Sequence, residues 1–136
     1  MNNFEKLKTI IEENKELVGI LGLGYVGLPL AVTFAKKGIK VLGFEKSGRK
    51  VEALGQKKNY IADVRDGDLA AVIDRGNLCA TTDFSRIAEC NAVIICVPTP
   101  LDKYKKPDMS FIESACRDIG KYMRRGTFIC LESTTY

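Results

Sequence analysis

The chain has 136 residues, 46% of them hydrophobic, and a formal net charge of +4, which suits one globular domain with a buried core. No run of Lys and Arg is interleaved with aromatic residues, so nucleic-acid binding has little support. No apolar stretch reaches membrane-spanning length and the N-terminus lacks a signal-peptide core, so we expect a cytoplasmic protein without a membrane partner. Histidine is absent and the five cysteines contain no C-x-x-C pair, so we expect no metal site and assign no cysteine to catalysis.

The first third of the chain alternates helical and strand patterns. Apolar residues at positions 4, 7, 10, 11 and 17 predict a short amphipathic N-terminal helix over the domain surface. The apolar run 17–21 predicts the first strand, 30–35 predicts a helix that stops at Gly38, and 39–44 predicts the second strand. The second strand ends on the acidic Glu45.

The rest of the chain continues this alternation. Helices are expected at 47–56, 66–75 and 84–88, the last one capped by Asp83. Strands are expected at 78–81, 92–97 and 127–131, and the continuous apolar run 92–97 predicts burial on both faces. Ser110 and Glu113 form a candidate capping box for a helix running to about Met123, after a Pro- and Lys-rich loop at 98–107.

This order of elements predicts one α/β domain over residues 1–136. Strands that alternate with helices build a parallel sheet with right-handed crossovers. We therefore expect a Rossmann-type, doubly wound parallel sheet with helices on both faces and a short N-terminal helix.

The turn between the first strand and the following helix carries a Gly-x-Gly-x-x-Gly motif. Gly22 permits the tight turn, Gly24 leaves room for a pyrophosphate against the backbone, and Gly27 lets the helix pack close to the strand. The N–H groups of Tyr25 and Val26 stand at the positive end of the helix. A bare triplet also occurs in turns without a ligand, but strand, turn, helix, strand and acid in this order favour dinucleotide binding.

Glu45 lies at the spacing of about 20 residues where an acid binds the adenosine ribose. Its carboxylate can accept both ribose hydroxyls and would repel a 2′-phosphate, which favours NAD over NADP. Lys46, Arg49 and Lys50 follow directly and oppose this argument, because a cationic cluster attracts a 2′-phosphate. The alternative for these three residues is a solvated helix start.

Two polar segments follow the fourth and fifth predicted strands. Thr99 lies in Val-Pro-Thr-Pro at 97–100, and Ser133 and Thr134 follow the last strand. Ligands of open parallel sheets bind outside the carboxyl ends of the strands, so these residues are expected near the reactive half of the cofactor. Alternatively, Thr99 only stiffens a turn between prolines, and Ser133 or Thr134 only caps a following helix.

Several of these segments resemble the UDP-glucose/GDP-mannose dehydrogenase family. The segments are GLGYVGLPLA at 22–31, ICVPTPL at 95–101 and LESTTY at 131–136. Three further segments are similar to the subgroup of UDP-N-acetylglucosamine 6-dehydrogenases: NYIADV at 59–64, LCATTDF at 78–84 and KPDMSFIESA at 106–115. The resemblance covers nearly the whole chain.

The resemblance implies two successive NAD-dependent oxidations that turn a sugar C6 alcohol into a carboxylate, in polysaccharide biosynthesis. It implies that pyrophosphate binds at Gly22, Gly24, Gly27 and the amides of Tyr25 and Val26, and adenosine ribose at Glu45 and Lys50. Thr99 and Thr134 are implied on the cofactor's nicotinamide side, Val97 is a further cofactor-binding residue, and Thr134 also resembles the catalytic threonine that positions a water. The family usually has Asp where Glu45 stands, so this chain carries the longer of the two acidic side chains there.

The family's nucleophilic cysteine, catalytic lysine, central helix and nucleotide-sugar domain have no counterpart in residues 1–136. We therefore expect a truncated cofactor domain that is inactive alone, with a nucleotide-sugar substrate in the full-length enzyme and a homodimer as one possibility. Two alternatives stay open: another Rossmann oxidoreductase, such as a 3-hydroxyacid dehydrogenase, and a non-catalytic NAD-binding module. The segments VPTP and LESTTY speak against the first of these.

Overall fold

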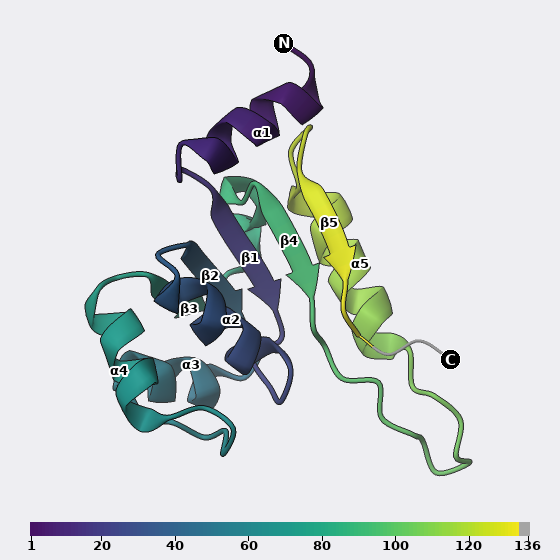
Figure 1. Cartoon of the computed structure of the whole chain (residues 1–136). Helices are drawn as coiled ribbons and strands as arrows, with labels where there is room; N and C mark the ends of the chain where they lie inside the picture. Colours follow the sequence, from purple (N-terminus) through teal and green to yellow (C-terminus); the bar gives the residue numbers. More distant parts are fainter. Residues whose placement is uncertain (134–136) are drawn as a thin grey trace.

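Five parallel strands form one sheet in the computed structural model, which describes residues 1–133 (Figure 1). The strand order is β3-β2-β1-β4-β5, the doubly wound order of a Rossmann fold. The strands are β1 (Leu17–Leu21), β2 (Lys40–Phe44), β3 (Leu78–Thr81), β4 (Ala92–Ile95) and β5 (Phe128–Leu131). Each pair of neighbours is parallel, which confirms the predicted sheet.

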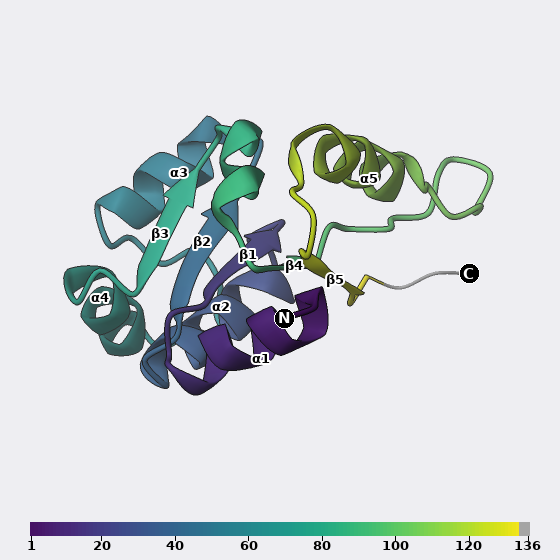
Figure 2. The ribbon, with the colours of Figure 1, turned by 90° about the horizontal axis from the view of Figure 1, so that it is seen from above.

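Helices cover both faces of this sheet, as expected (Figure 2). They are α1 (Asn3–Glu12), α2 (Gly27–Lys36), α3 (Gly48–Gly55), α4 (Asp66–Asp74), the 3₁₀ helix η1 (Phe84–Glu89) and α5 (Ser110–Tyr122). On one face, buried side chains of α2, α3 and α4 pack against the sheet, for example Ala31, Leu54 and Leu69. On the other face, Ile87 of η1 and Ile119 of α5 pack against β2 and β4.

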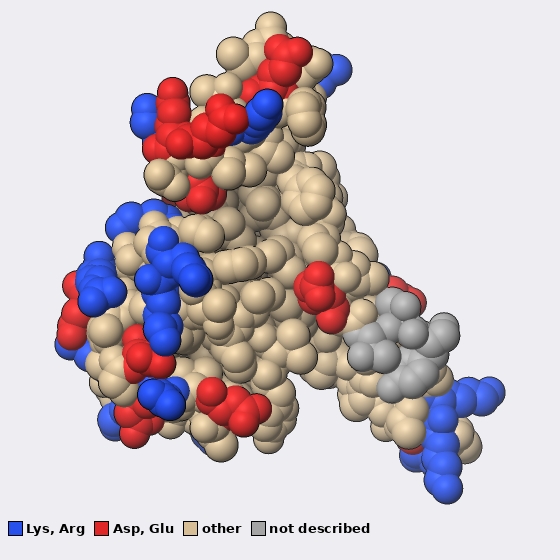
Figure 3. Space-filling view, viewed as in Figure 1, with Lys and Arg blue, Asp and Glu red and all other residues tan. Residues whose placement is uncertain are grey.

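The fourth strand is less buried than its composition predicts. It ends at Ile95, and its exposure alternates: Val93 and Ile95 are buried, whereas Ala92 and Ile94 are half-buried. The prediction of burial on both faces over 92–97 was only partly right, because Cys96 is buried in the cluster on the α2 side, whereas Ala92 and Ile94 are half-buried. Phe128 of the edge strand β5 is 55% exposed. Figure 3 shows that few charged side chains lie over this part of the sheet.

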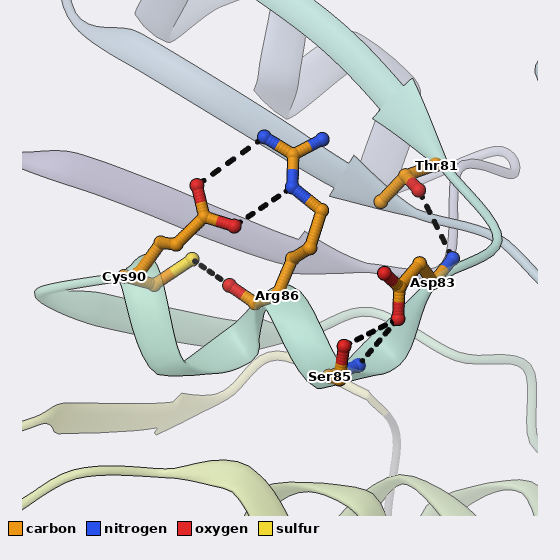
Figure 4. A network of polar contacts seen from close by, with 6 residues as sticks. Thr81, Asp83, Ser85, Arg86 and Cys90 are labelled. Carbon is orange, nitrogen blue, oxygen red and sulfur yellow. Dashed lines mark hydrogen bonds and ion pairs between the residues drawn. The ribbon is translucent and has the colours of Figure 1, made fainter.

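A side-chain cap explains where η1 begins, whereas α5 begins without a side-chain cap. Asp83 accepts the Ser85 N–H at 3.0 Å, which confirms the predicted cap, although the element it starts is a 3₁₀ helix (Figure 4). The predicted capping box of Ser110 and Glu113 is absent from this described helix. Asp108 instead accepts the Ser110 N–H at 2.9 Å, so Ser110 already lies inside the first turn.

The N-terminal helix α1 forms as predicted, at the amino end of the sheet (Figure 1). It buries none of its residues, and Phe4 is 74% exposed. Within the described part of the chain, no helix combines the length and the apolar character that crossing a membrane requires. The predicted loop 98–107 contains no helix or strand beyond one bridge between Leu101 and Pro107.

Candidate cofactor-binding site

A cavity of about 730 Å³ lies at the carboxyl ends of the strands, where α2 begins. Its lining unites most of the predicted site residues: Gly22, Gly24, Tyr25, Val26, Glu45, Lys50, Val97 and Thr99. Gly27 does not line the cavity, because it packs beneath the turn. Thr134, the predicted catalytic residue, lies outside the described residues.

The three glycines of the turn meet three different steric requirements. Gly22 has a φ of +93°, and a Cβ there would stand 2.9 Å from the Cys96 carbonyl oxygen. A Cβ at position 27 would stand only 1.7 Å from the Gly22 oxygen. A Cβ at Gly24, in contrast, would meet no protein atom within 4 Å. Gly22 and Gly27 are therefore needed for the fold, and Gly24 leaves space for a ligand.

The start of α2 presents backbone donors to this cavity. Tyr25 and Val26 are 82% and 55% exposed, and their N–H groups donate to no acceptor within residues 1–133. The N-cap residue Val26 makes no side-chain cap bond, and the first turn of α2 carries no acidic residue. Free N–H groups at the positive end of a helix favour an anion, and a pyrophosphate fits this requirement.

Glu45 connects the Gly-rich turn to the end of β2. Its Oε1 accepts the Leu23 N–H at 3.2 Å, and its Oε2 accepts the Ser47 N–H at 2.9 Å. The sequence predicts ribose hydroxyls as partners of this carboxylate, but not these backbone bonds. Each carboxylate oxygen can accept more than one hydrogen bond, so both retain capacity for a hydroxyl.

The three cations after β2 do not act as one cluster. The Lys46 ammonium lies 3.5 Å from Asp118 of α5 and also donates to Ser114. Arg49 and Lys50 remain in the lining of the 730 Å³ cavity. The Lys50 ammonium lies 5.5 Å from the ring centroid of Tyr60, within cation–π range. Arg49 and Lys50 therefore line the larger cavity, whereas Lys46 lines a smaller cavity beside it.

Tyr60 and Ile61 also line the cavity, and the sequence predicted a site role for neither residue. The Tyr60 hydroxyl donates to the Leu23 carbonyl oxygen at 2.6 Å. Burial, together with the negative charge of Glu45, raises the pKa of Tyr60 above its ordinary value. Asn59 holds this segment by accepting the Ile61 N–H at 2.9 Å. The only sequence signal for Tyr60 was its place in the NYIADV segment.

The ends of β4 and β5 close the other side of the cavity. Ser133 donates to the Val97 carbonyl oxygen at 2.8 Å and so joins the two strand ends. Val97 and Thr99 line the cavity here, where the sequence places the nicotinamide half. Cys96 also contributes to the wall, and burial, reinforced by the nearby Glu132 carboxylate, raises its thiol pKa to about 11. This thiol stays protonated at neutral pH and is a poor nucleophile.

A smaller cavity of about 240 Å³ continues from the first on the α5 side of the sheet. The two share Gly22, Glu45, Lys50, Val97 and Pro98 in their linings. Phe84 of η1 and Phe111 of α5 add aromatic walls to the smaller cavity. Aromatic walls suit a planar base, whereas the larger cavity has the free N–H groups that suit phosphates.

The fold and this site define an NAD-binding Rossmann domain of an oxidoreductase. Residues 16–136 match the model of the "UDP-glucose/GDP-mannose dehydrogenase family, NAD binding domain". The chain belongs to this family, as its segments suggested. The family match decides against the other Rossmann oxidoreductases that the sequence left open.

Individual relatives support this assignment. The chain is 38% identical over 119 residues to UDP-N-acetyl-D-glucosamine 6-dehydrogenase of Pseudomonas aeruginosa, which covers 88% of this chain and 27% of the relative. It is 35% identical to UDP-N-acetyl-D-mannosamine dehydrogenase of Pyrococcus horikoshii, over 86% of this chain and 28% of the relative. The crystal structure of a ternary complex of GDP-mannose dehydrogenase from Pseudomonas aeruginosa superposes with a TM-score of 0.82 at 32% identity, covering 87% of this chain and 28% of that chain. The chain thus spans about a quarter of the length of these proteins.

Proposed function

We propose that this domain serves an enzyme that oxidises the C6 alcohol of UDP-N-acetylglucosamine, or of a related UDP-sugar, to a carboxylate. One alcohol and one water are consumed with two NAD⁺, giving one carboxylate, two NADH and three protons. The observation that carries the proposal is the single cavity that joins the Gly-rich turn, Glu45 and the Thr99 segment in a member of this family. UDP-N-acetylglucosamine is chosen because the relative at 38% identity has that substrate in its name.

The site residues fit an extended dinucleotide whose adenosine half lies at Glu45 and whose nicotinamide half lies near Thr99. The free N–H groups of Tyr25 and Val26 would bind the pyrophosphate over Gly24, and Glu45 and Lys50 would hold the adenosine ribose. The smaller cavity with Phe84 and Phe111 would take the adenine. NAD, when bound, supplies the hydride acceptor for both oxidations.

The nicotinamide half would then extend toward the ends of β4 and β5. Val97 and Thr99 would contact it there, and the bond from Ser133 to the Val97 carbonyl would hold that wall in place. We propose that Thr134 positions the water of the second oxidation, as the family resemblance implies. This proposed direction of binding rests on the separation of Glu45, directly after β2, from Thr99 after β4.

A substrate test on the complete product of the gene decides between related sugars. NADH formation is followed with UDP-N-acetylglucosamine, UDP-N-acetylmannosamine, UDP-glucose and GDP-mannose. We expect the highest kcat/KM with UDP-N-acetylglucosamine and two NADH per sugar. A higher kcat/KM with another sugar would move the substrate assignment to it, and no NADH with any of the four would contradict the proposed oxidation. In that case the non-catalytic NAD-binding module would be the remaining hypothesis.

A further inference from the structure

Tyr60 reaches the Gly-rich turn from a part of the chain outside the dinucleotide fingerprint. It lies between α3 and α4, 37 residues from Leu23, and its hydroxyl donates to the Leu23 carbonyl oxygen at 2.6 Å. The ring is half-buried and lies under the Lys50 ammonium. This contact therefore connects the segment after α3 directly to the turn that carries the three glycines.

The Leu23 carbonyl belongs to the same planar peptide as the Gly24 N–H. In a trans peptide these two groups point in opposite directions, so a bond that fixes the carbonyl also fixes the N–H. Gly24 lines the cavity, and its N–H donates to no acceptor within the described residues. The Tyr60 hydroxyl therefore holds the Gly24 N–H directed away from Tyr60 and free to bind a ligand.

The preceding peptide is fixed by a different group. Glu45 accepts the Leu23 N–H, and this bond orients the peptide between Gly22 and Leu23. The Leu23 side chain is fully buried, and its Cδ1 stands 2.6 Å from where a Cβ of Gly43 would be built. Leu23 is thus anchored through its side chain, and Tyr60 and Glu45 set the orientation of the peptides on its two sides.

We propose that Tyr60 is a positioning residue for the pyrophosphate of NAD. Its hydroxyl holds the Leu23–Gly24 peptide in the orientation in which the Gly24 N–H joins the N–H groups of Tyr25 and Val26 as phosphate donors. A turn held in this way before the ligand arrives loses less conformational entropy on binding. The inference rests on NAD binding by this domain and is independent of which sugar is oxidised.

The Tyr60 hydroxyl stays protonated at physiological pH and can therefore always donate this hydrogen bond. Burial and the Glu45 carboxylate disfavour the phenolate, so Tyr60 keeps its proton at physiological pH. A protonated hydroxyl donates to the Leu23 carbonyl, whereas a phenolate would repel it. The positioning is therefore independent of pH across the neutral range.

The test compares Tyr60→Phe with Tyr104→Phe, which removes a hydroxyl from an exposed tyrosine in the loop after β4. Affinities for NAD, ADP-ribose and adenosine are measured on the purified chain, since adenosine lacks the pyrophosphate. We expect Tyr60→Phe to weaken NAD and ADP-ribose by about 5- to 10-fold, the effect of one hydrogen bond. Adenosine binding should be unchanged, and Tyr104→Phe should behave as the unaltered chain.

A second measurement follows the Gly24 amide by NMR. In Tyr60→Phe we expect this resonance to broaden or shift in the free protein and its NAD-induced shift to shrink, while the melting temperature stays close to that of Tyr104→Phe. If Tyr60→Phe weakened the binding of all three ligands equally, Tyr60 would contact adenosine directly and the inference would be overturned. An unchanged NAD affinity of this variant would overturn it as well. No NAD binding by the unaltered chain would instead overturn the cofactor site itself.

Discussion

The carbonyl oxygen of Gly22 stands 1.7 Å from the position that a Cβ of residue 27 would occupy. No side chain fits there while α2 keeps its place over β1, because the contacted atom is backbone and cannot rotate away. The strand, the turn and the helix are therefore coupled through one pair of glycines. Gly24, between them, has no such neighbour.

Replacing Gly27 by alanine should destabilise the fold. We expect Gly27→Ala to lower the free energy of unfolding by about 3 kcal/mol or more, because the added methyl forces α2 away from the turn. Urea denaturation measures this change. The matched control is Gly120→Ala in α5, where a Cβ meets nothing within 4 Å and helix propensity should add stability. A Gly27→Ala chain as stable as this control would contradict the steric argument.

Replacing Gly24 by valine should leave the stability of the fold unchanged but abolish NAD binding. The position is sterically open, so we expect the far-ultraviolet circular dichroism and the urea midpoint to stay near those of the unaltered chain. The branched side chain would fill the space over the turn in which a pyrophosphate lies, so NAD binding should be lost. Calorimetric titration checks this, and an unchanged NAD affinity would remove the Gly-rich turn from the binding site.

The preference for NAD over NADP should depend on Glu45 more than on the cations that follow it. Two unit charges about 8 Å apart at an effective dielectric constant of about 20 repel by roughly 2 kcal/mol, which is a lower bound for a 2′-phosphate beside Glu45. We therefore expect NAD to bind about 30-fold more tightly than NADP. Lys46→Ala should leave this ratio unchanged, because Lys46 is directed to Asp118 and Ser114 on α5.

The control for that prediction is Glu45→Gln, which keeps a polar side chain and removes the charge. It should reduce the NAD preference, although it also disturbs the bonds to Leu23 and Ser47. Both affinities are measured by calorimetry on each variant. Equal or tighter binding of NADP by the unaltered chain would mean that Arg49 and Lys50 dominate the ribose end of the cavity.

The sequence predicted the parts of the site that depend on local geometry. Gly22 and Gly27 are recognisable because a tight turn and a close helix packing each require glycine at a fixed spacing. The bond from Tyr60 to Leu23 could not be predicted in the same way, since 37 residues separate the partners and no periodicity connects them. The contact depends on the tertiary arrangement of the segment after α3, which places Tyr60 beside the Gly-rich turn.

One local prediction was wrong and a second was only partly right. At the start of α5, Asp108 accepts the Ser110 N–H and the Met109 carbonyl accepts the Glu113 N–H, so both N–H groups of the predicted capping box are already bonded. In β4, the apolar residues suggested two covered faces, but coverage depends on the helices nearby. Ile94 packs against the cluster on the α2 side but stays half-buried, whereas Val93 is fully buried in the cluster that contains Ile119 of α5.

Stability should fall in alkaline solution because of two buried thiols. Burial raises the pKa of Cys90 to about 12 and that of Cys96 to about 11, from a value of 9.0. A group with a raised folded-state pKa stabilises the protein below its unfolded pKa and loses that contribution as pH rises toward the folded value. We expect the free energy of unfolding to decrease from about pH 9 upward, by at most about 1.4 kcal/mol per pH unit for each thiol.

Other side chains of a protein also ionise in alkaline solution, so the thiol contribution needs its own control. The double variant Cys90→Ala and Cys96→Ala has no thiol at these positions, and its free energy of unfolding should depend less steeply on pH above 9. Denaturation at several pH values compares the two proteins. Parallel pH profiles would show that burial of these thiols does not govern alkaline stability.

The isolated 136-residue chain should bind NAD but oxidise no nucleotide sugar. Aldehyde oxidation in a dehydrogenase that uses a covalent thiohemiacetal needs a cysteine with a lowered pKa. Here burial raises the thiol pKa of Cys90 and Cys96, and a hydrogen bond to Glu132 raises that of Cys130. Hydride transfer also needs the sugar held close to the nicotinamide, and the chain spans only about a quarter of the relatives' length.

The assay follows NADH absorbance with the purified chain, NAD and either UDP-N-acetylglucosamine or UDP-glucose. The expected rate equals that of the buffer blank, while calorimetry on the same preparation shows bound NAD. A variant with all five cysteines replaced by alanine or serine separates genuine thiol chemistry from a contaminating enzyme. Turnover that is lost in this variant would assign the covalent step to one of these thiols. Turnover that persists in it, and scales with the concentration of the pure chain, would show that these 136 residues oxidise the sugar without a thiol nucleophile.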